Sequence, residues 1–93
     1  RIAGAVQVRD ALRRLPVDLQ LVVELHYWED HSTAEIAALL ELAQGTVKSR
    51  LRRAREALEA DLHTDATAVS ALLGRAKPDV GTEAPDGSSA APP

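Results

Sequence analysis

The sequence contains no cysteine, no methionine and no phenylalanine, and it has one Trp and one Tyr among 93 residues. Without cysteine there is no disulfide framework and no thiolate metal site, a composition that suits a reducing cytoplasm. Leu, Val and Ala supply most of the apolar 45%. These residues fill the ridges and grooves between helices better than the faces of a sheet, so the composition predicts an all-α fold.

Long apolar runs and an N-terminal signal are also missing. No run approaches the roughly 20 residues that a membrane-spanning helix needs, and no signal peptide is present, so we expect no membrane insertion. The first residue is Arg1 rather than methionine. We therefore expect the chain to be a fragment or a processed product.

The net charge is −3, which by itself argues against a nucleic-acid partner. Residues 1–62 contain nine Lys/Arg and ten Asp/Glu, and residues 63–93 contain two Lys/Arg and four Asp/Glu. Residues 44–55, in contrast, contain five Lys/Arg and no carboxylate. Because the local field governs a DNA-binding face, this short stretch outweighs the net charge of the chain.

The same basic stretch has the periodicity of a helix with one buried face. At 3.6 residues per turn one stripe is apolar, and the opposite side carries cations. A basic run alone indicates only a solvated surface. A helix with an apolar stripe and a basic outer face, however, is typical of an element that lies in the major groove of DNA. The stripe consists of Val47, Leu51, Ala54, Leu58 and Leu62.

Three further helices are expected before the basic one. They span about residues 3–14, 16–28 and 33–40, and the last begins with the capping box formed by Ser32 and Glu35. The short turn before Gln44 then predicts a helix-turn-helix. The residues expected to be buried are Val6, Val8, Ala11 and Leu12 in the first helix, Leu21, Val22, Leu25 and Trp28 in the second, and Ile36, Ala37, Leu39 and Leu40 in the third.

The chain divides into three parts. Residues 1–62 are expected to form a DNA-binding domain. Residues 63–76 form a short helix or a linker, with Thr64 as a cap and Gly74 as a stop signal. Residues 77–93 are rich in Pro, Gly, Ser and Ala, have no apolar period, and are predicted to be a disordered, flexible tail.

Several segments closely resemble domain 4 of bacterial sigma factors of the sigma-70 family, with the extracytoplasmic-function (ECF) subgroup as the best match. These segments are Leu-Pro at 15–16, Leu-His-Tyr-Trp-Glu-Asp at 25–30, Ser-Thr-Ala-Glu-Ile-Ala at 32–37 and Gly-Thr-Val-Lys-Ser-Arg at 45–50. The resemblance implies a small four-helix domain with a winged-helix-like helix-turn-helix. It also implies recognition of the −35 element in double-stranded promoter DNA, by which a sigma factor directs RNA polymerase to start transcription. The β-subunit flap of the polymerase and an anti-sigma factor are the implied protein partners.

The resemblance also assigns DNA-facing positions. Arg can donate two hydrogen bonds to guanine, and Lys and Ser can bind phosphate or a base edge. For Arg50 and Arg55, which flank the apolar stripe, we expect phosphate contacts or ion pairs rather than base reading. The complete set of expected DNA-binding residues is Thr46, Lys48, Ser49, Arg50, Arg52 and Arg53.

This chain departs from the family at three positions. Glu41 stands where the family usually has glycine in a left-handed turn, at a cost of roughly 1 kcal/mol. Ala43 stands where the family often has a capping Ser or Pro, a loss of about 1 kcal/mol. His31 replaces an apolar residue and is expected to be a partly buried turn residue. The first two changes imply a reshaped turn or a looser start of the basic helix.

No enzyme activity and no cofactor are predicted. The spacing of His26, His31 and His63 fits no zinc pattern, and no catalytic triad or phosphate loop is present. Tyr27 and Trp28 are expected in the core and its rim rather than stacked on bases. Two alternative functions stay open, namely a protein-interaction module and the helix-turn-helix output domain of a response regulator.

Overall fold

A computed structural model describes residues 4–78, which are almost entirely helical. The elements are α1 (Ala5–Arg13), α2 (Val17–Val23), the π-helical segment η1 (Glu24–Trp28), α3 (Thr33–Leu40), α4 (Gln44–Leu62) and α5 (Ala66–Arg75). Residues 4–78 form no β-strand, so the predicted all-α class is confirmed and no wing of strands accompanies the helix-turn-helix there. No helix among these residues is long and apolar enough to cross a membrane. The predicted tail at 79–93 lies outside the described residues.

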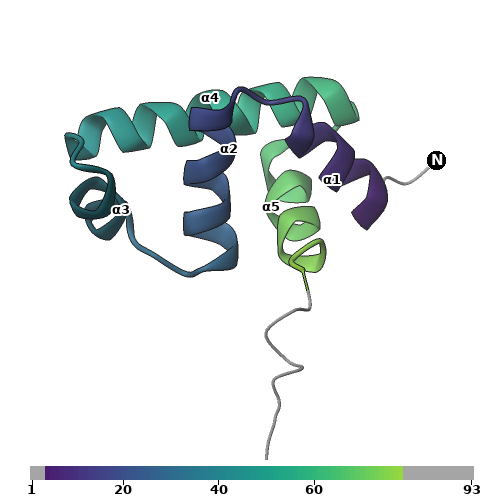
Figure 1. Ribbon diagram of the computed structural model, residues 1–93. Coiled ribbons are helices and arrows are strands. Elements are labelled where there is room, and N and C mark those ends of the chain that lie inside the picture. The colour runs from purple at the N-terminus through teal and green to yellow at the C-terminus, as the bar shows by residue number, and fades with distance from the viewer. Residues whose placement is uncertain (1–3, 79–93) are drawn as a thin grey trace, which may run out of the picture.

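The longest helix, α4, organises the fold. Figure 1 shows α4 along one side of the molecule, with the other helices on the same side of it. It contacts α1, α2, α3 and α5. The predicted stripe explains this central place, because Val47, Leu51, Ala54 and Leu58 are buried and Leu62 packs against the core. One side of α4 is therefore covered by protein, and the other is left free.

The burial predicted for the first three helices is correct only in part. Val8, Ala11, Leu12, Val22, Ile36 and Ala37 are buried, and Leu25, Trp28 and Leu40 are half-buried against the core. Val6, Leu21 and Leu39, in contrast, are exposed, with Leu39 at 58%. Each of these elements is rich enough in apolar residues to offer more than one stripe. Packing against the neighbouring helices decides which stripe is buried, and on α2 the buried residues are Leu19, Val22 and Val23.

The second helix was expected to run unbroken to Trp28, but its last turn is wider than an α-helix. From Glu24 onward the backbone is π-helical, and the Glu29 N–H donates to the Glu24 carbonyl. The wide turn brings the Trp28 indole towards α5, where Nε1 donates to the Leu73 carbonyl at 2.8 Å. The chain then reverses through Asp30, which has a left-handed backbone with φ 59°.

The helix-turn-helix has the predicted boundaries and the predicted capping box. The Ser32 hydroxyl accepts from the Glu35 N–H at 3.0 Å, and the Glu35 carboxylate accepts from the Ser32 N–H at 2.8 Å. After α3 the backbone at Glu41 is left-handed, with φ 57° and ψ 49°. The Leu42 N–H then donates to the Ala37 carbonyl at 2.9 Å, which closes a Schellman turn. The turn thus keeps its left-handed shape although it lacks glycine.

The segment after α4 forms a helix, and two details of its prediction are wrong. Asp65, rather than Thr64, caps α5 by accepting from the Ala68 N–H, because its carboxylate lies at the residue just before the first turn. Gly74 lies inside α5 and does not end it. The buried residues Val69, Leu72, Leu73 and Ala76 join the same core as α1, α2 and α4. The core therefore continues beyond Leu62, the residue at which the sequence suggested that the domain ends.

Candidate nucleic-acid interface

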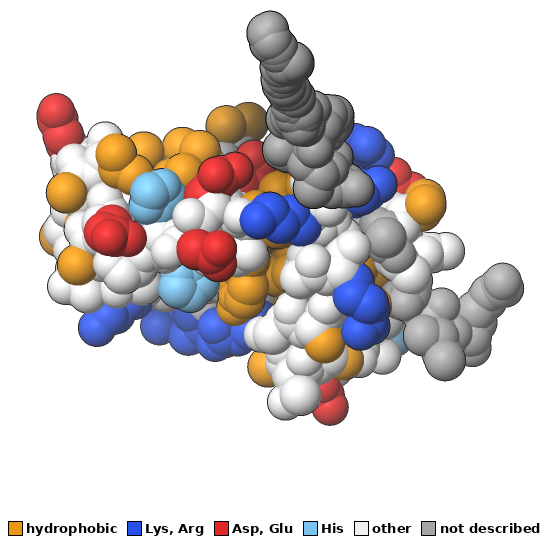
Figure 2. Space-filling model, turned by 90° about the horizontal axis from the view of Figure 1, so that it is seen from below, with side chains coloured by type: hydrophobic (Ala, Val, Ile, Leu, Met, Phe, Trp, Pro, Cys, Tyr) orange, Lys and Arg blue, Asp and Glu red, His pale blue; other side chains and the backbone are white. Residues whose placement is uncertain are grey.

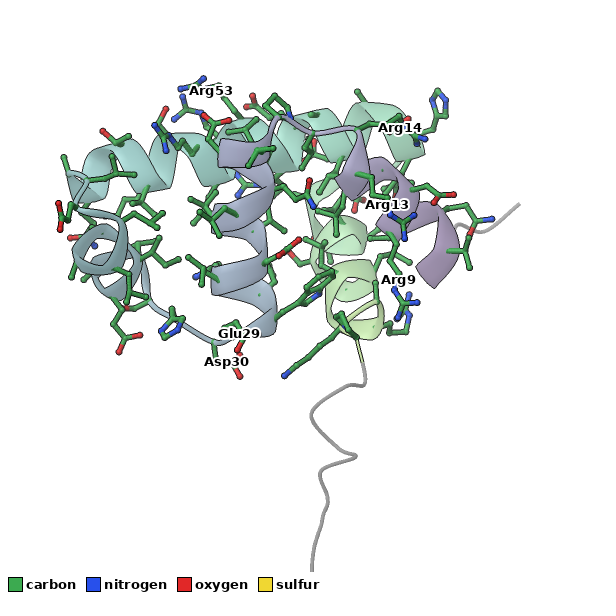
Figure 3. The ribbon with its side chains drawn as sticks, viewed as in Figure 1. Arg9, Arg13, Arg14, Glu29, Asp30 and Arg53 are labelled. Carbon is green, nitrogen blue, oxygen red and sulfur yellow. The ribbon has the colours of Figure 1, made fainter. Side chains whose placement is uncertain are left out.

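The outward side of α4 carries most of the predicted DNA-binding residues. Lys48, Arg52 and Arg53 are exposed, and Thr46 and Ser49 are half-exposed. Lys48 and Arg52 are four residues apart, as are Ser49 and Arg53, so the two pairs form neighbouring rows on the helix surface. Figure 3 shows Arg53 pointing away from the helix bundle. The structure therefore brings these five side chains together on one surface, which we call the α4 outer face.

Some of the cations on α4 lie close to a carboxylate, and others do not. Arg52 Nε lies 4.0 Å from Glu56 Oε2, and Arg55 Nε lies 3.8 Å from Glu59 Oε2. Arg50 is only 26% exposed and lies 3.8 Å from an Asp18 oxygen on α2. Lys48 and Arg53 form no ion pair with any residue in 4–78. These two cations are thus the ones most available to an anionic partner.

Arg50 takes a different place from the other predicted residues. Its side chain lies at the border of the buried stripe and reaches towards α2 rather than the α4 outer face. The ion pair is one of the two contacts expected for Arg50. Since the pair with Asp18 joins two helices, Arg50 also helps to hold α4 against α2.

The first turn of α4 leaves backbone donors uncovered. Ala43 precedes the helix and supplies no side-chain cap, as expected. The N–H groups of Gln44 and Gly45 have no acceptor among residues 4–78. Apart from the chain neighbours of Gly45 and the backbone of its own helix, no atom lies within 4 Å of the place where a Cβ of Gly45 would stand. The Gln44 side chain donates to Thr33 Oγ1 at 2.7 Å, which ties this turn to α3. Free amides at a helix N-terminus favour an anion such as a phosphate.

Three arginines in α1 or directly after it form a second basic group, but each is bound within the fold. Arg9 Nε donates to the Ala76 carbonyl at 3.0 Å, Arg13 pairs with Asp10 at 2.7 Å, and Arg14 pairs with Asp61 at 2.8 Å. In Figure 3 these three arginines lie well apart from Arg53. These contacts within the fold account for the three arginines, so we do not include them in the α4 outer face.

The side of the molecule away from α4 carries charges of both signs (Figure 2). Figure 3 places Glu29 and Asp30 at the end opposite Arg53, and the view from that end in Figure 2 shows carboxylates around two histidines. Cations in Figure 2 line one edge, and others lie at the centre and on the far half of the same face. The carboxylates of Glu29 and Asp30 thus lie far from Arg53, at the opposite end of the molecule (Figure 3).

The histidines and aromatic residues serve the fold. His26 Nδ1 lies 2.8 Å from the His31 carbonyl oxygen, and His31 Nδ1 lies 3.5 Å from Glu35 Oε1. The Ser32 N–H and the His31 side chain lower the pKa of Glu35 by hydrogen bonding to its carboxylate. No group of three potential metal ligands occurs within residues 4–78. Tyr27 and Trp28 pack against the core, as predicted.

Sequence reasoning missed the carboxylates that pair with the cations. The partners Glu56 and Glu59 follow their arginines by four residues, so this spacing was a readable signal. Asp18, the partner of Arg50, is 32 positions away along the chain and carries no such signal.

A family model described as Sigma-70, region 4 matches residues 5–58. The chain is 46% identical over 62 residues to the RNA polymerase sigma-E factor of Streptomyces antibioticus, an alignment that covers 67% of this chain and 34% of that protein. It is 44% identical over 55 residues to the ECF RNA polymerase sigma factor SigL of Mycobacterium tuberculosis, and this alignment covers 59% of this chain and 31% of SigL. The chain is 41% identical over 58 residues to the ECF RNA polymerase sigma factor SigM of the same organism, and this alignment covers 62% of this chain and 30% of SigM. No solved structure matches significantly.

The chain thus spans about a third of the length of these curated relatives. The family match covers α1 to most of α4, including the α4 outer face, and leaves α5 outside. The family is non-enzymatic, and the match decides against the output domain of a response regulator. This chain belongs to the sigma-70 region 4 family, and its relatives are ECF sigma factors.

Proposed function

We propose that this domain recognises the −35 element of bacterial promoters, with the α4 outer face in the major groove. The observation that carries the proposal is the pair Lys48 and Arg53, two exposed cations without a carboxylate partner among residues 4–78. They lie on a helix that directly follows the turn of a helix-turn-helix. In the families that use this motif, such a second helix reads base edges.

The residues divide by position into base-reading and phosphate-binding groups. Arg53 and Lys48 face outward and can reach guanine O6 and N7, and Ser49 lies beside Arg53 for a further base-edge contact. Thr46 lies next to the free amides of Gln44 and Gly45, so it is placed for phosphate. Arg50, at the edge of the interface, is expected to bind phosphate only if it leaves Asp18.

Protein partners form the second part of the proposal. Val17 on α2 is 79% exposed, and Leu21 lies one turn further along the same face. Next to them is a groove of about 190 Å³, lined by residues that include Leu12, Trp28 and Arg13. An apolar face beside a groove suits a partner helix. We propose that this side contacts the RNA polymerase β-subunit flap and an anti-sigma factor. We also propose that the domain acts in the bacterial cytoplasm.

Binding of duplex promoter DNA by two arginine variants tests the proposal. Arg53→Ala should weaken binding by about 1–3 kcal/mol and relax base preference, because it removes a base-edge contact. Arg13→Ala is the matched control, since Arg13 is an exposed arginine on α1, far from Arg53 in Figure 3. It should change affinity by less than twofold. Equal losses for the two variants would show that DNA binding does not depend on the α4 outer face.

A further inference from the structure

The cationic row on the α4 outer face ends in a carboxylate. Lys48, Arg52 and Glu56 succeed one another at four-residue steps, so they lie along one line of the helix surface. The neighbouring row of Ser49 and Arg53 continues through Ala57 and reaches a carboxylate only at Asp61, which lies further along α4 and pairs with Arg14. Glu56 is therefore the first negative charge that a duplex would meet on this face. It is also 62% exposed.

Glu56 already contacts one of the DNA-binding residues. Its Oε2 lies 4.0 Å from Arg52 Nε, and both side chains are more than half exposed. The order of the two residues, with the cation N-terminal to the carboxylate, is the less favourable one for an i,i+4 pair. Arg52 can therefore leave Glu56 for a phosphate, but it must give up this partner to do so.

The length of the helix places Glu56 near the DNA backbone. With a rise of 1.5 Å per residue, Glu56 lies about 12 Å along α4 from Lys48. This is about the width of the major groove. If the first turns of α4 lie in the groove, as the proposed function requires, Glu56 comes close to the phosphates at its far wall. A carboxylate at that place opposes binding by like-charge repulsion.

We propose that Glu56 lowers the affinity of this domain for duplex DNA, by drawing Arg52 away from the phosphates and by setting a carboxylate beside them. The inference rests on the proposed function, since it assumes that the α4 outer face meets DNA. Its effect is independent of base sequence, because phosphates are the same in every duplex. Glu56 thus restrains binding to unrelated DNA, which surrounds any promoter in large excess.

Glu56→Gln and Glu59→Gln make the same change of charge on the same helix. Glu59 pairs with Arg55 beside the buried stripe and is only 29% exposed, so it serves as the matched control. Glu56→Gln should raise the affinity for an unrelated duplex about threefold or more. It should also steepen the log–log salt slope by up to about 0.9, the value of one additional phosphate contact. That slope makes the gain about threefold larger at 50 mM salt than at 200 mM. Glu59→Gln should stay within twofold of the wild type, with an unchanged slope.

The outcomes separate this inference from the proposed function. Equal gains from Glu56→Gln and Glu59→Gln would overturn the inference, because net charge alone would then explain both. An unchanged salt slope in Glu56→Gln would overturn it too. Promoter binding by the wild type that becomes weaker and less selective among base sequences in Arg53→Ala upholds the proposed function in either case. A wild type that binds no duplex would overturn both.

Discussion

Replacing Glu41 by glycine should stabilise the domain, because the backbone at this residue is left-handed. With φ 57° and ψ 49°, the Cβ of Glu41 crowds the following carbonyl. This conformation costs a residue other than glycine roughly 1–2 kcal/mol. The Glu41 side chain is exposed and forms no hydrogen bond or ion pair with residues 4–78, so the substitution removes no contact there.

The expected gain is smaller than the strain that is relieved. Glycine has more conformational freedom in the unfolded chain, which costs about 0.5–1 kcal/mol. The net increase in the free energy of unfolding is therefore about 0.5–1 kcal/mol. For a domain of this size that corresponds to a rise in Tm of about 2–8 °C. Thermal unfolding followed by far-UV circular dichroism measures it directly.

Two further variants make the result specific to the left-handed turn. Glu41→Ala keeps the Cβ and should bring little of the gain. Ala57→Gly, at an exposed right-handed position within α4, should destabilise the domain by about 1 kcal/mol. If Glu41→Gly instead destabilises the domain as Ala57→Gly does, the turn after α3 is not left-handed in solution and the reasoning fails.

Three further substitutions test the packing of α5 and the cap of α3. Leu73→Ala should cost about 2–5 kcal/mol in chemical denaturation, because Leu73 is only 1% exposed; a loss near zero would show that α5 is detached. Trp28→Phe removes the indole donor to the Leu73 carbonyl and should cost about 1 kcal/mol, whereas no loss would argue against that hydrogen bond. Since the pKa of Glu35 is lowered, its ionised form stabilises the fold above the ordinary value of 4.5, and this contribution disappears as the pH falls through the lowered pKa. Glu35→Gln should therefore be less stable than the wild type at pH 7 and approach it at strongly acidic pH; a difference that does not depend on pH would contradict this.

The features predicted well from the sequence are the local ones. The apolar stripe of α4 needs only the 3.6-residue period, and the capping box needs only Ser32 and Glu35 at the right spacing. The outward direction of Lys48 and Arg53 follows from the same period. These features depend on residues within a few turns of one another, so the chain itself contains the whole signal.

The features that were missed depend on distant contacts. The π-helical turn brings Trp28 to Leu73, 45 residues away, and no periodicity in either segment indicates that meeting. The exposure of Leu21 and Leu39 likewise depends on which face the neighbouring helices cover. At the interface, the partner of Arg50 is Asp18 on another helix. A sequence pattern predicts which side chains face outward and which ion pairs form within one helix, but it does not predict an ion pair between two helices.

Selection of duplex DNA from a random pool tests the central claim most directly. The wild-type chain should enrich one short motif, and Arg53→Ala should lose the preference at one or two positions of that motif while it still binds DNA in a salt-dependent way. Arg13→Ala should select the same motif as the wild type. If the wild type enriches no motif, or if Arg53→Ala selects the wild-type motif unchanged, the α4 outer face does not read the sequence of DNA.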